Sequence, residues 1–223
     1  MNRFVKTQEL FDCKTPYLTE FFKRSTYPWD MIPAISEYIK TLLSDGLEGF
    51  TKYADGVYVG KNVTIAPTAT IQGPTIIGNN TEIRPGAYIR GNVIIGDNCV
   101  IGNSTEIKNS ILLDKVQVPH YNYIGDSILG NRAHMGAGAV CSNLKADGSN
   151  VVVRGDVLYR TGLRKLGGIL GDGADIGCGC VLNPGTVIGK NTSVYPMTAL
   201  RGVLPDNSIV KSMKNIVSRL PKK

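Results

Sequence analysis

His120 is the side chain in this sequence best suited to acid–base chemistry, and cations recur at related spacings. An imidazole with an ordinary pKa of about 6.5 can take a proton from an attacking amine or hydroxyl near neutral pH. Arg90 and Lys108 are 18 residues apart, and Arg84 precedes His120 by 36. Paired cations recognise phosphate and similar anions. These residue types therefore predict a general base beside a binding site for an anionic acceptor.

A six-residue apolar repeat must position these side chains. Between Val57 and Leu113 an aliphatic residue occupies every sixth position, and the residue four places after it is small or apolar. A helix repeats about every 3.6 residues and a strand every two, so the period favours a hexapeptide solenoid whose stacked aliphatic side chains form the core. The ten positions are Val59, Ile65, Ile71, Ile77, Ile83, Ile89, Ile95, Ile101, Ile107 and Leu113, and the spacing resumes at Leu170, Ile176, Leu182, Ile188, Val194 and Leu200.

This repeat resembles the left-handed parallel β-helix, an all-β solenoid in which three hexads make one triangular coil and the prisms usually trimerise. The resemblance covers residues 57–210 and implies that residues 18 apart stack on one face. Arg90 and Lys108 should then project from adjacent coils, and Arg84 should lie in the same column as His120, with Gly102 leaving open surface between them. We expect a shortened, irregular corner at residues 119–124.

Three further segments complete the expected organisation. Residues 1–50 show a helix start at Thr15-Pro16, helical apolar spacing and a stop at Gly46, so we expect a short N-terminal helical cap on the first coil. Residues 51–210 form the β-helix, and residues 141–168 lack the repeat and form an inserted loop. Insertions in solenoids emerge on one face and often carry function. Residues 211–223 form a C-terminal tail.

Composition narrows the function classes. A net charge of +7 suits anionic partners, but no basic run with interleaved aromatic residues appears, so we expect no nucleic-acid partner. No signal peptide and no long apolar run is present, so we expect a cytoplasmic protein without a membrane partner. Five cysteines without a CxxC pair are typical of small buried residues in a reducing compartment. Two histidines are too few for the three-histidine site of the gamma-class carbonic anhydrases that share this fold, so no metal is expected.

Ordered motifs carry a more specific resemblance. They are Glu82-Ile-Arg84-Pro-Gly-Ala87, Glu106-Ile-Lys108-Asn, His120-Tyr-Asn-Tyr123-Ile-Gly-Asp126, Met135-Gly-Ala137-Gly138 and Ser142-Asn143. They resemble the acetyltransferase domain of the bifunctional N-acetylglucosamine-1-phosphate uridyltransferase/glucosamine-1-phosphate acetyltransferase. They are also similar to stand-alone proteins related to UDP-N-acetylglucosamine pyrophosphorylase. No strand with a Gly-rich phosphate loop opens the first fifty residues, so we expect no uridyltransferase or pyrophosphorylase activity.

The resemblance implies a role for each matching position. His120 matches the catalytic base that deprotonates the sugar amine. Arg84, Lys108 and Tyr123 match contacts to the sugar phosphate or nucleotide, and Asn143 matches a residue lining the acetyl site. Ala137 and Cys178 match contacts to coenzyme A, and Lys211 or Lys214 matches a basic residue that binds the coenzyme phosphates. His134 stands where the family often has Asn, which implies altered acceptor contacts.

The leading hypothesis is an acetyl-CoA-dependent acyltransferase that acts on an amino sugar phosphate or a nucleotide amino sugar. His120 would be the base, Arg84, Arg90 and Lys108 would hold the anionic acceptor, and backbone N–H groups at residues 136–138 would polarise the thioester carbonyl. A site between adjacent prisms of a homotrimer is expected, because one convex prism offers no deep pocket. Transfer to a hydroxyl stays open, and the rival hypothesis is a non-catalytic sugar-nucleotide-binding or scaffold protein.

Overall fold

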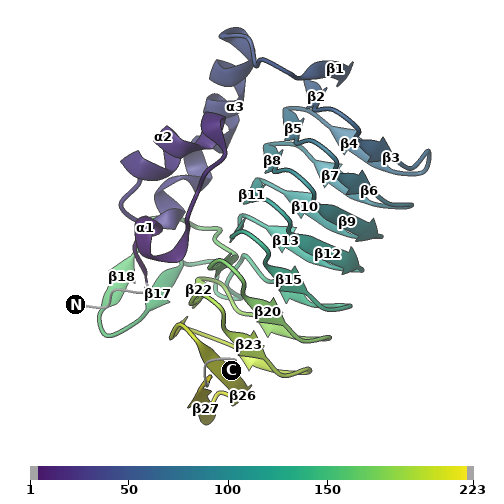
Figure 1. The fold of residues 1–223 in the computed structure, drawn as a ribbon. Coiled ribbons are helices and arrows are strands. Elements are labelled where there is room, and N and C mark those ends of the chain that lie inside the picture. The colour runs from purple at the N-terminus through teal and green to yellow at the C-terminus, as the bar shows by residue number, and fades with distance from the viewer. Residues whose placement is uncertain (1–4, 220–223) are drawn as a thin grey trace.

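The chain is a left-handed parallel β-helix with a helical N-terminal segment, as the repeat predicts (Figure 1). A computed structural model describes residues 5–219, so the ends of the expected cap and tail, residues 1–4 and 220–223, lie outside it. Three sheets form the sides of a triangular prism, and neighbouring strands within each sheet are parallel except in the terminal hairpins β1–β2 and β26–β27.

Each complete coil contributes one strand to each sheet, and the hairpin strands β1 and β27 extend sheets A and B. Sheet A contains β1 (Thr51–Ala54), β2 (Val57–Val59), β5 (Thr75–Ile77), β8 (Val93–Ile95), β11 (Ser110–Leu112), β14 (Ile128–Leu129), β19 (Gly168–Leu170), β22 (Thr186–Ile188) and β25 (Val203–Leu204). Sheet B contains β3 (Thr64–Ile65), β6 (Glu82–Ile83), β9 (Val100–Asn103), β12 (Gln117–His120), β15 (His134–Met135), β20 (Asp175–Ile176), β23 (Ser193–Val194), β26 (Ser208–Ser212) and β27 (Asn215–Ser218). Sheet C contains β4 (Thr70–Gln72), β7 (Tyr88–Arg90), β10 (Glu106–Lys108), β13 (Tyr123–Gly125), β16 (Val140–Cys141), β21 (Val181–Leu182) and β24 (Ala199–Leu200).

The aliphatic rungs fill the prism as predicted, with one correction. From Ile77 to Ile107 every predicted position is buried in the inner core, but the next inward residue is Leu112, and Leu113 packs on the opposite side of the wall. The sequence could not separate two adjacent leucines. Shortened steps of five residues therefore lie between Ile107 and Leu112 and between Ile124 and Leu129. The step from Val118 to Ile124 keeps its full six residues. The irregular corner predicted at residues 119–124 was wrong.

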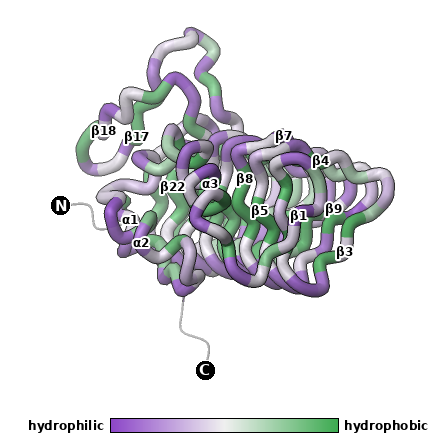
Figure 2. Tube along the Cα trace, turned by 90° about the horizontal axis from the view of Figure 1, so that it is seen from above, coloured by the Kyte–Doolittle hydropathy of each residue, from purple (hydrophilic) through white to green (hydrophobic). Residues whose placement is uncertain are grey.

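The N-terminal helices cover a side of the prism rather than its end, so their predicted place on the first coil was wrong. They are α1 (Thr7–Leu10), α2 (Pro16–Arg24), η2 (Pro28–Asp30), η3 (Ile32–Ala34) and α3 (Ile35–Ser44). Their apolar residues pack against a column of outward aliphatic side chains on sheet A, and Figure 2 shows α3 beside the hydrophobic stretches of β5 and β8. Inward residues of the first coil, such as Ile65 and Ile71, stay half-buried because no helix lies over them.

The segment without the repeat folds into a hairpin. β17 (Val152–Arg154) pairs antiparallel with β18 (Leu158–Arg160), and a single bridge joins Leu144 to Lys165 at its base. Val153 is buried on one hairpin face, and Tyr159 packs against Tyr27 and Trp29 of the helical segment. The insertion is therefore fastened to the prism. Among the described helices none is long and apolar enough to cross a membrane.

Candidate functional site

Three of the predicted site residues stack at the corner where sheet B turns into sheet C, called the B–C corner here. His120 ends β12, and Ala137 and Cys178 follow the neighbouring strands β15 and β20; all three residues are exposed. The Gly138 N–H donates to the His120 carbonyl at 3.0 Å, and the Gly179 N–H donates to the Ala137 carbonyl at 2.8 Å. The corner thus carries the predicted base and two predicted coenzyme contacts on consecutive coils.

The predicted column of Arg84, Gly102 and His120 does not form. His120 pairs in register with Asn103, so the position above Gly102 belongs to Pro119. The coil from Ile101 to Val118 contains seventeen residues rather than eighteen, because of the shortened step before Leu112. Gly102 leaves no open surface, since a Cβ there would lie 1.6 Å from the Pro119 carbonyl oxygen. Glycine is needed at position 102 because the Pro119 backbone lies directly against it.

The His120 backbone is held while its ring faces solvent. The His120 N–H donates to Asn122 Oδ1 at 3.2 Å, and the buried Asn122 amide donates to the Gly136 carbonyl at 2.8 Å. Asn122 therefore ties two coils together beneath the imidazole. Within residues 5–219 the ring of His120 makes no hydrogen bond and stays available to a substrate.

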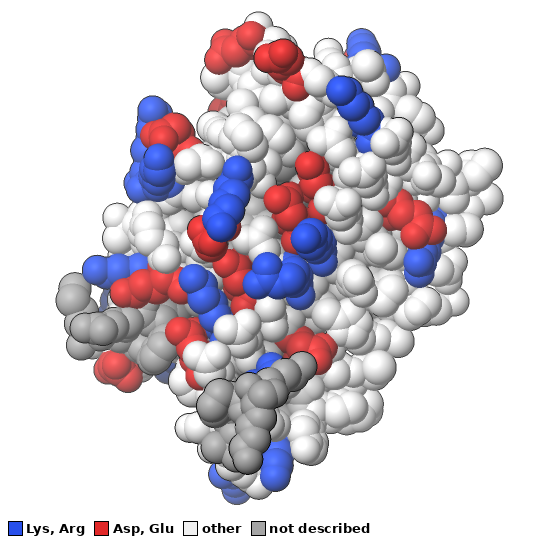
Figure 3. All heavy atoms as spheres, in the orientation of Figure 1, with Lys and Arg blue, Asp and Glu red and all other residues white. Residues whose placement is uncertain are grey.

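The predicted column of Arg90 and Lys108 is present, since Tyr88 pairs with Glu106 and Ile89 with Ile107. Each of the three cations predicted to hold the acceptor already has a carboxylate partner. The distances are 3.1 Å from Arg84 Nη2 to Glu82 Oε2, 2.7 Å from Arg90 Nη1 to Glu106 Oε1, and 3.1 Å from Lys108 Nζ to Asp126 Oδ2. The hydrogen bond that Arg90 donates to Glu106 raises the pKa of the Arg90 guanidinium. Acidic and basic groups are likewise interspersed over the face in Figure 3, so the net charge forms no single basic patch on that face.

A polar cluster surrounds Asp126 at the corner between sheets C and A. Asp126 is 4% exposed and accepts hydrogen bonds from Asn109 and Asn143 besides its ion pair with Lys108. Asn143 also donates to the Tyr123 hydroxyl at 3.3 Å. Burial, with the nearby carboxylates of Glu106 and Asp126, raises the pKa of Tyr123. The structure thus brings Lys108, Tyr123 and Asn143 together, but around a buried acid.

His134 has a partner that the sequence did not suggest. Its Nδ1 lies 2.8 Å from Asp175 Oδ1 on the outer surface of sheet B, where β15 pairs with β20. A carboxylate at one ring nitrogen fixes the orientation of the imidazole. The two residues are 41 positions apart because the insertion intervenes, so no local pattern could pair them.

The predicted coenzyme lysines lie on the terminal hairpin. The Tyr195 N–H donates to the Val210 carbonyl, which places Lys211 beside Tyr195, and Lys214 lies in the turn between β26 and β27. Two strand spacings, or about 10 Å, separate Lys211 from the coil of Cys178. Lys211 is therefore within the length of an extended coenzyme arm from the B–C corner.

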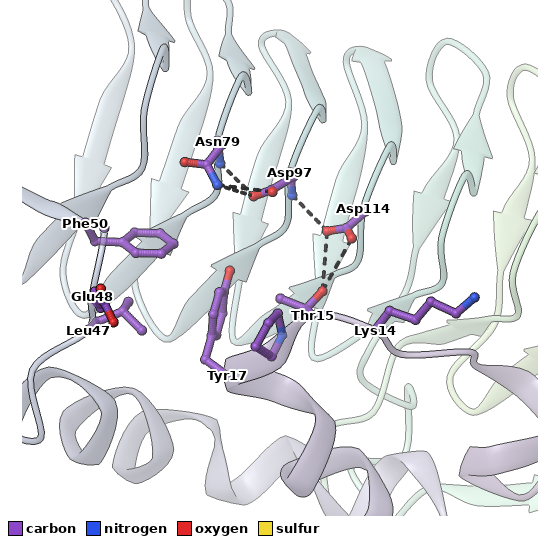
Figure 4. Close-up of a pocket in the computed structure, with 11 residues that line it drawn as sticks. Lys14, Thr15, Tyr17, Leu47, Glu48, Phe50, Asn79, Asp97 and Asp114 are labelled. Atoms are coloured by element: carbon purple, nitrogen blue, oxygen red, sulfur yellow. Dashed lines mark hydrogen bonds between the residues drawn. The ribbon is translucent and has the colours of Figure 1, made fainter.

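A cavity of about 710 Å³ lies away from all of these residues. Figure 4 shows its polar wall, a ladder in which Asp97 accepts from the Asn79 N–H at 2.7 Å and Asp114 accepts from the Asp97 N–H at 2.9 Å. Tyr17 and Phe50 form the opposite wall. Within residues 5–219 no group of three His, Cys, Asp or Glu side chains could hold a metal ion.

Comparison with known proteins agrees with the repeat and the motifs. Residues 71–163 match the family model described as the GMPPB C-terminal domain. A bifunctional protein GlmU from Methanococcus aeolicus is 32% identical over 199 residues, which are 88% of this chain and 48% of that protein. YaiX of Escherichia coli K12, an acetyltransferase by name, is 36% identical over 153 residues, 68% of this chain and 66% of YaiX.

The sequence fits the hexapeptide acetyltransferase domain of a GlmU-like protein. The chain spans only 22–48% of the length of the GlmU relatives it matches. Among solved structures, PerB from Caulobacter crescentus with CoA and GDP-perosamine has a TM-score of 0.36 at 17% identity, covering 70% of this chain and 56% of PerB. Arabidopsis UDP-N-acetylglucosamine acyltransferase has a TM-score of 0.45 at 13% identity, covering 72% and 63%. At these scores neither structure bears on what this chain binds.

One group of cations escaped the sequence reasoning. Lys145, Arg154 and Arg201 line a small cavity of about 90 Å³ at the base of the inserted hairpin. A signal for Arg201 was present, because it directly follows the inward Leu200 as Arg90 follows Ile89. The insertion at residues 141–168 lies between Lys108 and Arg201, so Arg201 is not a multiple of 18 residues from Arg90 and Lys108.

Proposed function

We propose that the chain is an acetyl-CoA-dependent acyltransferase that acetylates an amino sugar phosphate or a nucleotide amino sugar, with His120 as the general base. The observation that carries the proposal is the stacking of His120, Ala137 and Cys178 on consecutive coils at the B–C corner. The resemblance assigns the first of these to the base and the other two to the coenzyme. The name of YaiX supports the acetyltransferase class.

In the proposed reaction the acceptor amine attacks the carbonyl carbon of the thioester while the His120 imidazole takes the amine proton. A C–N bond forms, the C–S bond breaks, and the departing thiolate recovers the proton from the imidazolium. The Gly136 and Gly138 N–H groups donate to the carbonyls of Ile176 and His120, so they are not available. Within residues 5–219 the Ala137 N–H has no acceptor, and we assign it to the thioester oxygen.

A homotrimer fits the exposed apolar surface beside this corner. Tyr121, which follows His120, is 65% exposed, and Met197, whose N–H donates to the Cys178 carbonyl, is 81% exposed. Such side chains near one edge are typical of a contact with another protein surface. We propose that a neighbouring prism covers them and completes the acceptor site. The anionic acceptor would compete with Glu82 and Glu106 for Arg84 and Arg90, and His134 would contact the sugar.

Thiol release from acetyl-CoA over a panel of amino sugar phosphates and nucleotide amino sugars tests the proposal. His120→Ala should lower the rate by about two to four orders of magnitude. A loss under about threefold would exclude His120 as the base. His134→Ala is the matched comparison, since it removes the other imidazole; a large loss there alone would transfer the role to the His134–Asp175 pair.

The second candidate is a non-catalytic sugar-nucleotide-binding or scaffold protein. The carboxylate partners of Arg84, Arg90 and Lys108 favour it, because they reduce the positive field at the acceptor site. Thermal unfolding with acetyl-CoA or with UDP-GlcNAc separates the candidates. Stabilisation by acetyl-CoA supports the enzyme, and stabilisation by UDP-GlcNAc alone supports the binding protein.

A further inference from the structure

A small cavity at the base of the inserted hairpin gathers cations from three separate segments. Lys145 comes from the loop after β16, Arg154 ends β17, and Arg201 follows β24. Together with Asn183 and Gly202 they line a cavity of about 90 Å³. The site is distinct from the B–C corner, because Arg201 lies at the opposite edge of sheet C, where the chain turns toward sheet A.

Close packing holds Arg154 in this position. Gly202 has φ +80°, and a Cβ there would lie 2.8 Å from the Arg154 carbonyl oxygen, so the hairpin backbone rests directly on the coil. Val151 and Val153 lie against Gly185 on the preceding coil. The arrangement of Arg154 next to Arg201 is thus set by backbone contact rather than by flexible side chains.

The hairpin turns one face toward this cavity and the other toward the helical segment. Val153 and Tyr159 are cross-strand neighbours on the buried face. Val152 lines the cavity and lies opposite Arg160, so Arg160 shares the outer face with Arg154. A fourth cation therefore stands beside the three that line the cavity.

Within residues 5–219 the three arginines among these cations lack the carboxylate partners that neutralise Arg84, Arg90 and Lys108. Lys145 Nζ lies 3.3 Å from Asp147 Oδ2, and hydrogen bonds from Ser149 lower the pKa of that carboxyl. In the part of the chain that the structure describes, Arg154, Arg160 and Arg201 form no ion pair. Like charges brought together repel one another, and an anion between them removes that cost.

We propose that this cavity binds a phosphoryl group. Two guanidinium groups can each donate two parallel hydrogen bonds to phosphate oxygens, and a neighbouring ammonium adds a point charge. The cavity has room for a single phosphoryl group, and the exposed Arg160 can meet a second one at its mouth. Four strand spacings, about 19 Å, separate Arg201 from Lys108 along the same column, so the inference does not depend on the proposed acetyl transfer.

Isothermal titration calorimetry with inorganic phosphate, coenzyme A and UDP-GlcNAc tests the site in the full chain. The double variant Arg154→Gln/Arg201→Gln should weaken binding of at least one of these by about tenfold or more. The double variant Lys23→Gln/Lys40→Gln removes the same charge from the helices and should change affinity less than about twofold. Unchanged affinity for all three compounds in the first variant would overturn the proposal.

The three compounds also identify the source of the phosphoryl group. A loss confined to coenzyme A assigns the cavity to the coenzyme, a loss confined to UDP-GlcNAc assigns it to a sugar nucleotide, and a loss for phosphate alone assigns it to the free ion. Each of these supports a phosphoryl site. Arg201→Lys keeps the charge but not the paired donors, so it should lower the affinity less than the double variant does. An unchanged affinity in both Arg201→Lys and the double variant would contradict the assignment.

Discussion

The outer surfaces of sheets A and C differ in polarity and burial, although the inner surfaces of both sheets carry the same stack of aliphatic side chains. On sheet A the outward column consists of Ile76, Ile94, Ile111, Ile128, Ile169 and Val187, all fully buried. On sheet C the outward positions hold Tyr88, Arg90, Glu106, Lys108 and Tyr123, which face solvent or one another. The inward residues determine the coil, and the outward residues determine what covers each face.

This difference explains where chemistry is possible on the prism. The N-terminal helices bury the outer surface of sheet A, so its apolar side chains are covered within the chain and are not exposed to substrates. Sheets B and C keep their outer surfaces exposed, and both imidazoles and all the predicted cations lie on them or at their edges. The N-terminal helices therefore act as a fixed cover on one side and leave two sides for substrates or neighbouring prisms.

The largest expected effect comes from placing a charge under the helices. Ile94→Asp buries an unpaired carboxylate on sheet A and should lower the free energy of unfolding by about 4 kcal/mol or more. Val181→Asp puts the same group on sheet C at a side chain that is 39% exposed, and should cost less than about 0.5 kcal/mol. Urea unfolding measures both, and similar losses would refute the contrast between the two faces.

A smaller effect is expected at the one largely buried ion pair of sheet C. Lys108→Met leaves the buried Asp126 without its cation and should cost about 1–3 kcal/mol. Arg90→Met leaves the more exposed Glu106 and should cost about 0–1 kcal/mol. Adding Asp126→Asn to Lys108→Met should recover part of the loss. Equal costs for Lys108→Met and Arg90→Met in urea unfolding would mean that burial of Asp126 does not matter.

The smallest effect concerns the difference between core and surface thiols. Burial raises the pKa of the Cys141 thiol to about 11 from 9.0. Above pH 9 the unfolded chain loses this proton while the folded chain keeps it, so stability present below pH 9 falls as pH rises toward 11. Between pH 8 and pH 10 the loss should be about 1 kcal/mol from this group.

The matched variants Cys141→Ala and Cys178→Ala test that loss, since Cys178 is exposed at the B–C corner. Unfolding free energies at pH 8 and pH 10 should differ less in Cys141→Ala than in the unmodified chain, whereas Cys178→Ala should keep the full difference. The same pH dependence in both variants would show that burial of Cys141 does not set it. Native alkylation should also modify Cys178 well before Cys141, because only the former is accessible.

The sequence predicted the β-helix because its repeat is local. Each inward residue is related to the next by six positions, so the coil, the insertion and the stacking of Arg90 on Lys108 could be read without coordinates. The N-terminal helices were also predictable from capping and periodicity. Their position on sheet A was harder to predict. A signal was present, because Ile76 and Ile94 each precede an inward isoleucine and therefore point outward, which indicates a covered outer face.

The candidate site depended on distances that the repeat does not encode. Leu112 and Leu113 are both aliphatic, and the choice between them shifts every later corner residue by one place, which moved His120 out of line with Arg84. Ion pairing of the cations and the meeting of Arg154 with Arg201 arise between coils or across the insertion. The sequence alone therefore determined the stacked core, because inward residues recur at a regular spacing along the chain. The tertiary structure decided which outward side chains meet, because a coil that is one residue shorter shifts every later residue by one position relative to the earlier coils.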